Sequence, residues 1–166
     1  MKVLLIDPSR SYHRQSQAIR LNLPLGPLYV AAVLENNGFD VSVFDCKVAE
    51  KTRLENATDA RHFGVDDNYF MEVIADEKPD VVGISCMFTA QFDNYLHASK
   101  LVKQVCPDIH VVGGGPHFSV IDSDFLLENS DTDCYVSGEG EEPMLAIVKA
   151  LSENKCLDGI PGVTFL

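Results

Sequence analysis

The fold is decided by the run Pro79-Asp80-Val81-Val82-Gly83-Ile84-Ser85, a continuous apolar stretch introduced by a proline and an acid. Apolar and polar residues do not alternate in it, which is typical of a parallel strand covered by helices on both faces. Apolar residues at helical spacing follow over residues 92–105 and stop before Pro107. A second apolar run then occupies residues 109–112. This order predicts a strand, a crossover helix and a parallel neighbouring strand.

The same alternation extends toward both ends of the chain. The further elements that it predicts are strands at residues 3–6, 41–44 and 134–136, a helix over residues 25–37 closed by Gly38, a helix around residues 69–74, and a last helix from about Pro143. Together they predict an α/β, flavodoxin-like (Rossmann-like) doubly wound parallel sheet of five strands, in the order 2-1-3-4-5 within three α/β/α layers. Residues 8–24 read as a long polar connection, and residues 47–67 as a charged segment that wraps one edge.

Length and composition indicate one soluble domain over residues 1–166. The net charge of −12 disfavours nucleic acid and anionic membrane surfaces as partners. No apolar run reaches the length of a membrane span, and the N-terminus reads as a strand rather than a signal peptide, so a cytoplasmic location is expected.

The cysteines are too widely spaced for a zinc or iron–sulfur motif. Most of them lie in or beside predicted strands, as buried thiols of a reducing compartment do. The five are Cys46, Cys86, Cys106, Cys134 and Cys156.

In a doubly wound sheet, ligands bind beyond the carboxyl ends of the strands. The fourth strand ends there in Gly113-Gly114-Gly115-Pro116-His117. Three glycines remove every side chain where the backbone leaves the sheet, so a bulky flat ligand can approach closely; a tight turn is the alternative explanation. No dinucleotide fingerprint or phosphate-binding loop is present.

Two neighbouring loops add candidates at the same edge. The third strand ends in Ser85-Cys86-Met87-Phe88-Thr89, where Ser85 offers a hydroxyl and Thr89 is predicted to cap the next helix. Met87 and Phe88 are apolar residues that either pack in the core or line a hydrophobic ligand. After the fifth strand comes Ser137-Gly138-Glu139-Gly140-Glu141-Glu142, whose acids disfavour a phosphate and either cap the helix or accept hydrogen bonds from a neutral ligand.

In order along the chain, these segments resemble the N-terminal cobalamin (vitamin B12)-binding domain of B12-dependent radical SAM enzymes. The matching stretches are residues 23–34, 61–65, 79–85, 111–117, 138–142 and 160–163. Each is weak alone, but the ordered set covers nearly the whole chain.

The resemblance implies a cofactor site. In the wider cobalamin fold the nucleotide tail inserts beside strand three and the glycines after strand four, so Ser85 would face the tail base and Gly113 and Gly114 would take the paired-glycine position. The cofactor-binding residues expected on this basis are Leu25, Gly26, Ser85, Cys86, Met87, Phe88, Thr89, Gly113, Gly114, Gly115, Pro116, His117, Ser137, Gly138, Glu139 and Gly140.

The sequence departs from the wider cobalamin fold at the histidine that ligates cobalt. Mutases and methyltransferases of that fold carry D-x-H-x-x-G after strand one, and here residues 108–113 spell this string on entry to strand four. His110 is therefore expected at the far end of the sheet. The loop after strand one holds His13 without the required spacing; this histidine either is solvated or reaches cobalt if the loop folds over the corrin. With a solvated His13, cobalamin is expected to bind base-off, without a protein histidine, as the resemblance to the radical SAM subfamily implies.

The resemblance also implies a function for the whole protein. Methylcobalamin would be presented to a radical SAM domain that follows residue 166 and holds a [4Fe–4S] cluster and S-adenosylmethionine, for methyl transfer or a related radical reaction. Residues 160–166 read as a strand without a partner, which favours such a continuation. This domain alone would not be an enzyme. The rival hypotheses are a stand-alone corrinoid carrier and a flavodoxin-like regulatory or nucleotide-binding module.

Overall fold

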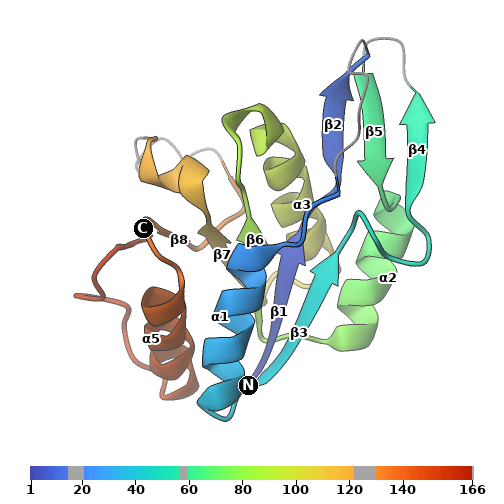
Figure 1. Cartoon of the computed structure of the whole chain (residues 1–166). Helices are drawn as coiled ribbons and strands as arrows, with labels where there is room; N and C mark the ends of the chain where they lie inside the picture. The colour runs from blue at the N-terminus through green and yellow to red at the C-terminus, as the bar shows by residue number, and fades with distance from the viewer. Residues whose placement is uncertain (15–20, 57–59, 122–129, 166) are drawn as a thin grey trace.

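The computed structural model describes residues 1–14, 21–56, 60–121 and 130–165. Its main sheet has the order β3-β1-β6-β7-β8-β9, so the predicted order of the first five strands is confirmed (Figure 1). The strands are β1 (Lys2–Asp7), β3 (Asp40–Asp45), β6 (Val81–Ser85), β7 (His110–Gly114), β8 (Cys134–Val136) and β9 (Val163–Phe165). The first five are parallel to one another.

Helices cover both faces of this sheet and create two cores. On one face, α1 (Leu25–Asn36) and α5 (Glu141–Ser152) pack over a core that includes Val3, Val81 and Val112. On the other face, α2 (Asp67–Glu77) and α3 (Phe92–Val105) pack over Leu4, Ile84 and their neighbours. Short 3-10 turns, η1 (Thr89–Gln91) and η2 (Pro116–Ser119), follow β6 and β7. No helix in the described ranges is both long and apolar enough to cross a membrane.

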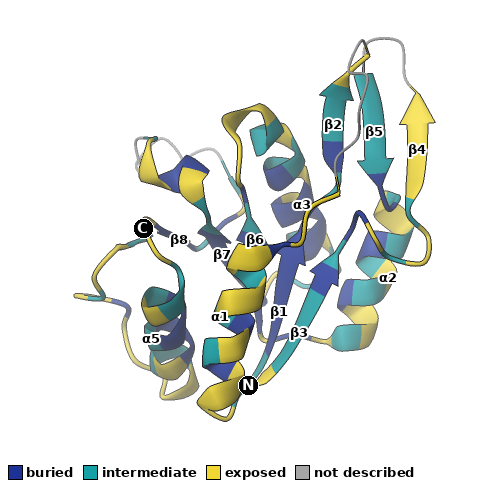
Figure 2. Ribbon diagram, viewed as in Figure 1, coloured by how far each residue is buried: buried dark blue, intermediate teal, exposed yellow. Residues whose placement is uncertain are grey.

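A second, three-stranded antiparallel sheet projects beyond the carboxyl ends of β1 and β3 (Figure 1). It contains β2 (Arg10–His13), β5 (Ala60–Gly64) and β4 (Arg53–Asn56) in that order. Residues 8–24, interpreted as a long polar connection, thus contain β2, and residues 47–67, interpreted as a charged segment that wraps one edge, contain β4 and β5. The hydrophobic pattern could not reveal these strands because every residue of β4 is exposed (Figure 2).

The expectation that residues 160–166 lack a partner strand was also wrong. Strand β9 pairs antiparallel with β8, and the backbone N–H of Ser137 donates to Gly162 O at 2.8 Å. Residues 163–165 thus form an edge strand that is paired along one side within the domain; Leu166 itself lies outside the described residues.

Candidate functional site

Ser85 and Gly114 lie side by side at the carboxyl edge, on the face covered by α1 and α5. They pair in register at the ends of β6 and β7. Side chains alternate between the two faces of a strand, and Val81 and Val112, an even number of residues earlier, belong to the core under α1 and α5. The described residues supply no hydrogen-bond partner for the half-buried Ser85 hydroxyl. Within the described ranges, this position therefore offers a hydroxyl without a hydrogen-bond partner beside a residue without a side chain.

The three glycines after β7 differ in what surrounds them. A Cβ added at Gly113 would lie 2.5 Å from the Tyr95 hydroxyl and 2.5 Å from the Tyr135 ring. Gly115 has a φ of +111°, and its Cβ would lie 2.8 Å from the carbonyl oxygen of Cys86. A Cβ at Gly114 would meet nothing within 4 Å. Internal packing accounts for Gly113 and Gly115, and only Gly114 opens onto free space.

The starts of α1 and α5 bring further glycines to this end of the same face. A Cβ at Gly26 or Gly138 would meet nothing within 4 Å, and one at Gly140 would lie 3.3 Å from Val30 Cγ2. The loop before α5 is held in place because the N–H of Gly138 donates to Ser119 Oγ at 2.9 Å. Leu25, Ser137 and Glu139, which neighbour these glycines in the chain, are exposed.

Cys86 and His117 lie on the opposite face, under α3. His117 is 2% exposed, its ring centroid is 4.6 Å from that of Phe92, and its backbone N–H donates to Cys86 O at 3.3 Å. Burial lowers the pKa of His117, so the imidazole is neutral at pH 7. Burial raises the pKa of the Cys86 thiol to about 12, which keeps it protonated. The structure thus separates these two side chains from Ser85 and Gly114.

Thr89 does not cap α3, contrary to the sequence prediction. Its Oγ1 lies 3.2 Å from His117 Nδ1, and it begins η1, which intervenes before the helix. The position preceding α3 is Gln91, which makes no side-chain capping bond. Gln91 instead accepts from the backbone N–H of Ser11 at 3.1 Å and thereby ties α3 to the small sheet.

Large apolar side chains are exposed around the carboxyl edge. Isolated exposed apolar residues are ordinary, but several at one edge indicate a surface that another group covers. They come from the segment leading into α1, from the loop after β6 and from the end of η2, and α1 is exposed over its first turns (Figure 2). The residues are Leu21, Leu23, Leu25, Leu28, Tyr29, Met87, Phe88 and Val120.

A buried charge cluster, which sequence reasoning missed, occupies the carboxyl ends of β1 and β3. Lys47 Nζ is inaccessible to solvent and lies 2.5 Å from Asp7 Oδ2 and 2.6 Å from Asp45 Oδ1. Both contacts are close ion pairs whose angles do not suit a hydrogen bond. Among the described residues, Nζ has no hydrogen-bond partner. Arg10 adds a second cation, with Nη2 at 3.5 Å from Asp7 Oδ2. Two cations therefore balance two carboxylates, and none of the four side chains is more than 9% exposed.

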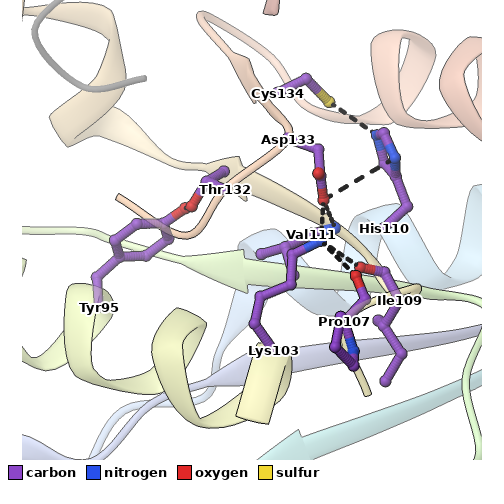
Figure 3. A network of polar contacts seen from close by, with 9 residues as sticks. All are labelled: Tyr95, Lys103, Pro107, Ile109, His110, Val111, Thr132, Asp133 and Cys134. Carbon is purple, nitrogen blue, oxygen red and sulfur yellow. Dashed lines mark hydrogen bonds and ion pairs between the residues drawn. The ribbon is translucent and has the colours of Figure 1, made fainter. Parts of the chain in front are cut away.

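His110 begins β7 at the amino edge of the sheet, as the sequence predicted. There Asp133 Oδ2 accepts from Lys103 Nζ at 2.8 Å and from the N–H of Val111 at 2.7 Å (Figure 3). His110 Nε2 lies 3.6 Å from the Cys134 sulfur, and its Nδ1 lies 4.0 Å from Asp133 Oδ2. Burial raises the pKa of Cys134 to about 12, so this triad-like arrangement holds an inert thiol. The network joins β7 to β8 and α3.

Comparison with known proteins gives a family match: the family model described as B12 binding domain matches residues 22–148. The cytidylyl-2-hydroxyethylphosphonate methyltransferase of Streptomyces wedmorensis is 33% identical over 99% of this chain and 31% of its own length. The cobalamin-dependent radical SAM methyltransferase TokK of Streptomyces tokunonensis is 32% identical over 52% of this chain and 13% of its own length. The chain thus spans about a third or less of the length of these relatives.

Solved structures agree on the fold. The methanol:cobalamin methyltransferase complex MtaBC from Methanosarcina barkeri matches 93% of this chain and 47% of its own, with a TM-score of 0.56 at 17% identity. NtrX from Brucella abortus matches 92% of this chain and 26% of its own, with a TM-score of 0.55 at 13% identity. Similar scores for these two proteins mean that the fold alone does not identify the ligand.

Proposed function

The chain belongs to the B12-binding domain family, and from this premise we propose that it binds cobalamin at the carboxyl edge of its parallel sheet. The observation that carries the proposal is the pairing of Ser85, whose hydroxyl has no partner among the described residues, with Gly114, where a side chain would meet only open space. A large flat cofactor needs such a close approach to backbone, together with a small number of polar contacts.

The nucleotide tail is assigned to the face under α1 and α5. Ser85 would hydrogen-bond to the tail, and Gly114 would let it lie against the end of β7. Gly26 and Gly138, near the starts of the two helices, would add bare backbone where a Cβ meets nothing within 4 Å. Four of the residues expected to contact the cofactor are not proposed as contacts. Cys86 and His117 are buried on the other face, and internal packing accounts for Gly113 and Gly115. The proposed role of Cys86 and His117 is to hold the loop after β6, which carries Met87 and Phe88.

Cobalamin is proposed to bind base-off, without a histidine of this domain on the cobalt. After β1 the buried side chain that pairs with Asp7 is Arg10, an arginine rather than an imidazole. His110 lies at the amino edge of β7, and His117 is packed against Phe92. His13 ends β2 on the small sheet and is exposed.

Electron paramagnetic resonance tests the absence of histidine ligation. In the cobalt(II) form of the loaded protein, we expect no threefold nitrogen splitting, because His110 lies at the amino edge of the sheet and His117 is buried on the face opposite the proposed site. A threefold splitting that is present in the spectrum of the parent and absent from that of His110→Ala or His117→Ala would show that a histidine ligates cobalt and would contradict the proposal. His97→Ala is the matched control, because His97 is exposed and pairs with Asp67 on the outer surface of α2 and α3.

The domain is further proposed to serve a radical SAM domain of the same polypeptide. When bound, methylcobalamin would supply a methyl group for transfer to carbon, with S-adenosylmethionine and a [4Fe–4S] cluster in the other domain. The exposed apolar residues at the carboxyl edge, such as Leu23, Tyr29 and Phe88, are the surface that this domain would cover. A C-x-x-x-C-x-x-C motif in the coding sequence beyond codon 166 is the expected result. A stop codon there, with no such motif in a neighbouring gene, would leave the stand-alone carrier.

The two rival functions are less well supported. A stand-alone carrier of the histidine-ligated type requires an imidazole after β1, where Arg10 pairs with Asp7 instead. A receiver-like regulatory module requires a phosphoacceptor aspartate at the end of the third strand in chain order of the main sheet, where this chain has Ser85.

A further inference from the structure

Arg10 has hydrogen-bonding capacity that the described part of the chain does not use. A guanidinium carries five N–H donors. The Arg10 side chain is 9% exposed, and within the described part of the chain its guanidinium makes one long hydrogen bond, from Nη2 to Asp7 Oδ2 at 3.5 Å. A buried donor left without an acceptor costs free energy, more so when the group is charged. The remaining Arg10 donors are not fully enclosed, since the enclosed polar side-chain atoms without a partner in the described part of the chain are Lys47 Nζ and His117 Nε2. An acceptor brought by a ligand can therefore reach them.

The fold holds this guanidinium in the middle of the carboxyl edge. Arg10 begins β2, where it pairs with Phe63 of β5, and the backbone is thereby fixed. Its Cζ lies 6.0 Å from the centroid of the Phe88 ring, which is half exposed in the loop after β6. The side chain thus bridges the end of β1 and the loop that follows the neighbouring strand, next to the proposed cofactor site.

Lys47, and not Arg10, is the cation closest to Asp7. Lys47 Nζ lies 1.0 Å nearer to the same oxygen, since the two distances are 2.5 Å and 3.5 Å. Lys47 is enclosed and contacts both carboxylates, whereas Arg10 lies at the outer end of the cluster with a planar fork of donors. A planar fork suits oxygen acceptors of phosphate or amide groups.

We propose that Arg10 donates hydrogen bonds to an oxygen of the bound corrinoid, either a phosphate oxygen of the nucleotide tail or an amide oxygen of the corrin side chains. The proposal rests on the proposed function. Asp7 and Lys47 orient the guanidinium, and the acceptor completes its hydrogen bonding. Arg10 is thus a recognition residue for the cofactor.

The test compares two corrinoids and three variants. Hydroxocobalamin and cobinamide, which lacks the nucleotide and its phosphate, are titrated into the parent, Arg10→Met and Arg10→Lys. Arg10→Lys keeps the cluster electrically balanced but removes the fork, so it serves if Arg10→Met fails to fold. Arg53→Met, at a largely exposed arginine of β4, is the matched control and should bind like the parent.

We expect the two Arg10 variants to bind hydroxocobalamin about ten- to a hundredfold more weakly, the loss that a charge-assisted hydrogen bond accounts for. An equal loss for cobinamide identifies a corrin amide as the acceptor, and an unchanged cobinamide affinity identifies the phosphate. If a folded Arg10→Lys binds both corrinoids within twofold of the parent, the role of Arg10 is refuted and the proposed function stands. If the parent binds neither corrinoid, both are refuted.

Discussion

Replacing Gly114 with leucine abolishes binding of cobalamin and leaves the domain folded. Apart from its neighbours in the chain, the new Cβ would meet no atom of the described residues within 4 Å, so we expect the fold to accept the side chain. The space that it enters, beside the Ser85 hydroxyl, is where the cofactor tail is proposed to lie. We expect titration with hydroxocobalamin to show at least a hundredfold loss of affinity, about 3 kcal/mol, with an unchanged circular dichroism spectrum.

The neighbouring glycine provides the contrasting control. In Gly113→Ala the new Cβ would lie 2.5 Å from both the Tyr95 hydroxyl and the Tyr135 ring, so two buried tyrosines must move. This variant should lose stability in urea denaturation, as overpacked cores do, by about 1–3 kcal/mol. Full cobalamin binding by Gly114→Leu would show that the cofactor lies elsewhere.

Replacing Lys47 with methionine destabilises the domain strongly. The change removes the closest cation from Asp7 and Asp45 while both carboxylates stay buried, and one arginine at 3.5 Å cannot take its place. Breaking a buried ion pair from one side costs about 3–5 kcal/mol. We expect the free energy of unfolding, measured by urea denaturation, to fall by that amount.

An exposed ion pair supplies the control for this prediction. Lys51 Nζ lies 3.0 Å from Glu72 Oε2, and both side chains are about half exposed. Solvent screens such pairs, so Lys51→Met should unfold close to the parent. If the two lysine variants unfold at the same urea concentration, the cluster at the ends of β1 and β3 is not a determinant of stability.

The sequence predicted the parts of the fold whose signals are local. The helix over residues 92–105 has apolar residues at helical spacing and a proline after it, and β6 and β7 are continuous apolar runs. The small sheet has no such signal. Strand β4 buries nothing, and the pairing of Arg10 with Phe63 joins residues far apart in the chain. Hydrophobic periodicity is a local signal and does not predict pairing between strands that are far apart in the sequence.

The sequence predicted that the candidate residues follow the carboxyl ends of neighbouring strands, where Ser85 and Gly114 do pair, but the prediction did not separate the residues of the two faces of the sheet. Successive side chains of a strand point to opposite faces, so the sequence alone predicts that Ser85 and Cys86 lie on different faces of the sheet. The sequence does not predict the environments of Gly113, Gly114 and Gly115, because these depend on Tyr95, Tyr135 and the loop after β6. The sequence does contain a signal for the charge cluster. Asp7 and Asp45 follow two strands that are neighbours in the predicted order, so their carboxylates lie close together. Two such carboxylates require a nearby cation, such as Lys47.

The measurement that tests the central claim most directly is the retention of cobalamin by the unmodified chain. The protein is incubated with hydroxocobalamin, freed of unbound cofactor by gel filtration, and examined by ultraviolet–visible spectroscopy. The account predicts that the corrin absorbance elutes with the protein in a molar ratio near unity, and that Gly114→Leu elutes colourless. A folded parent protein that elutes without corrin absorbance would contradict it.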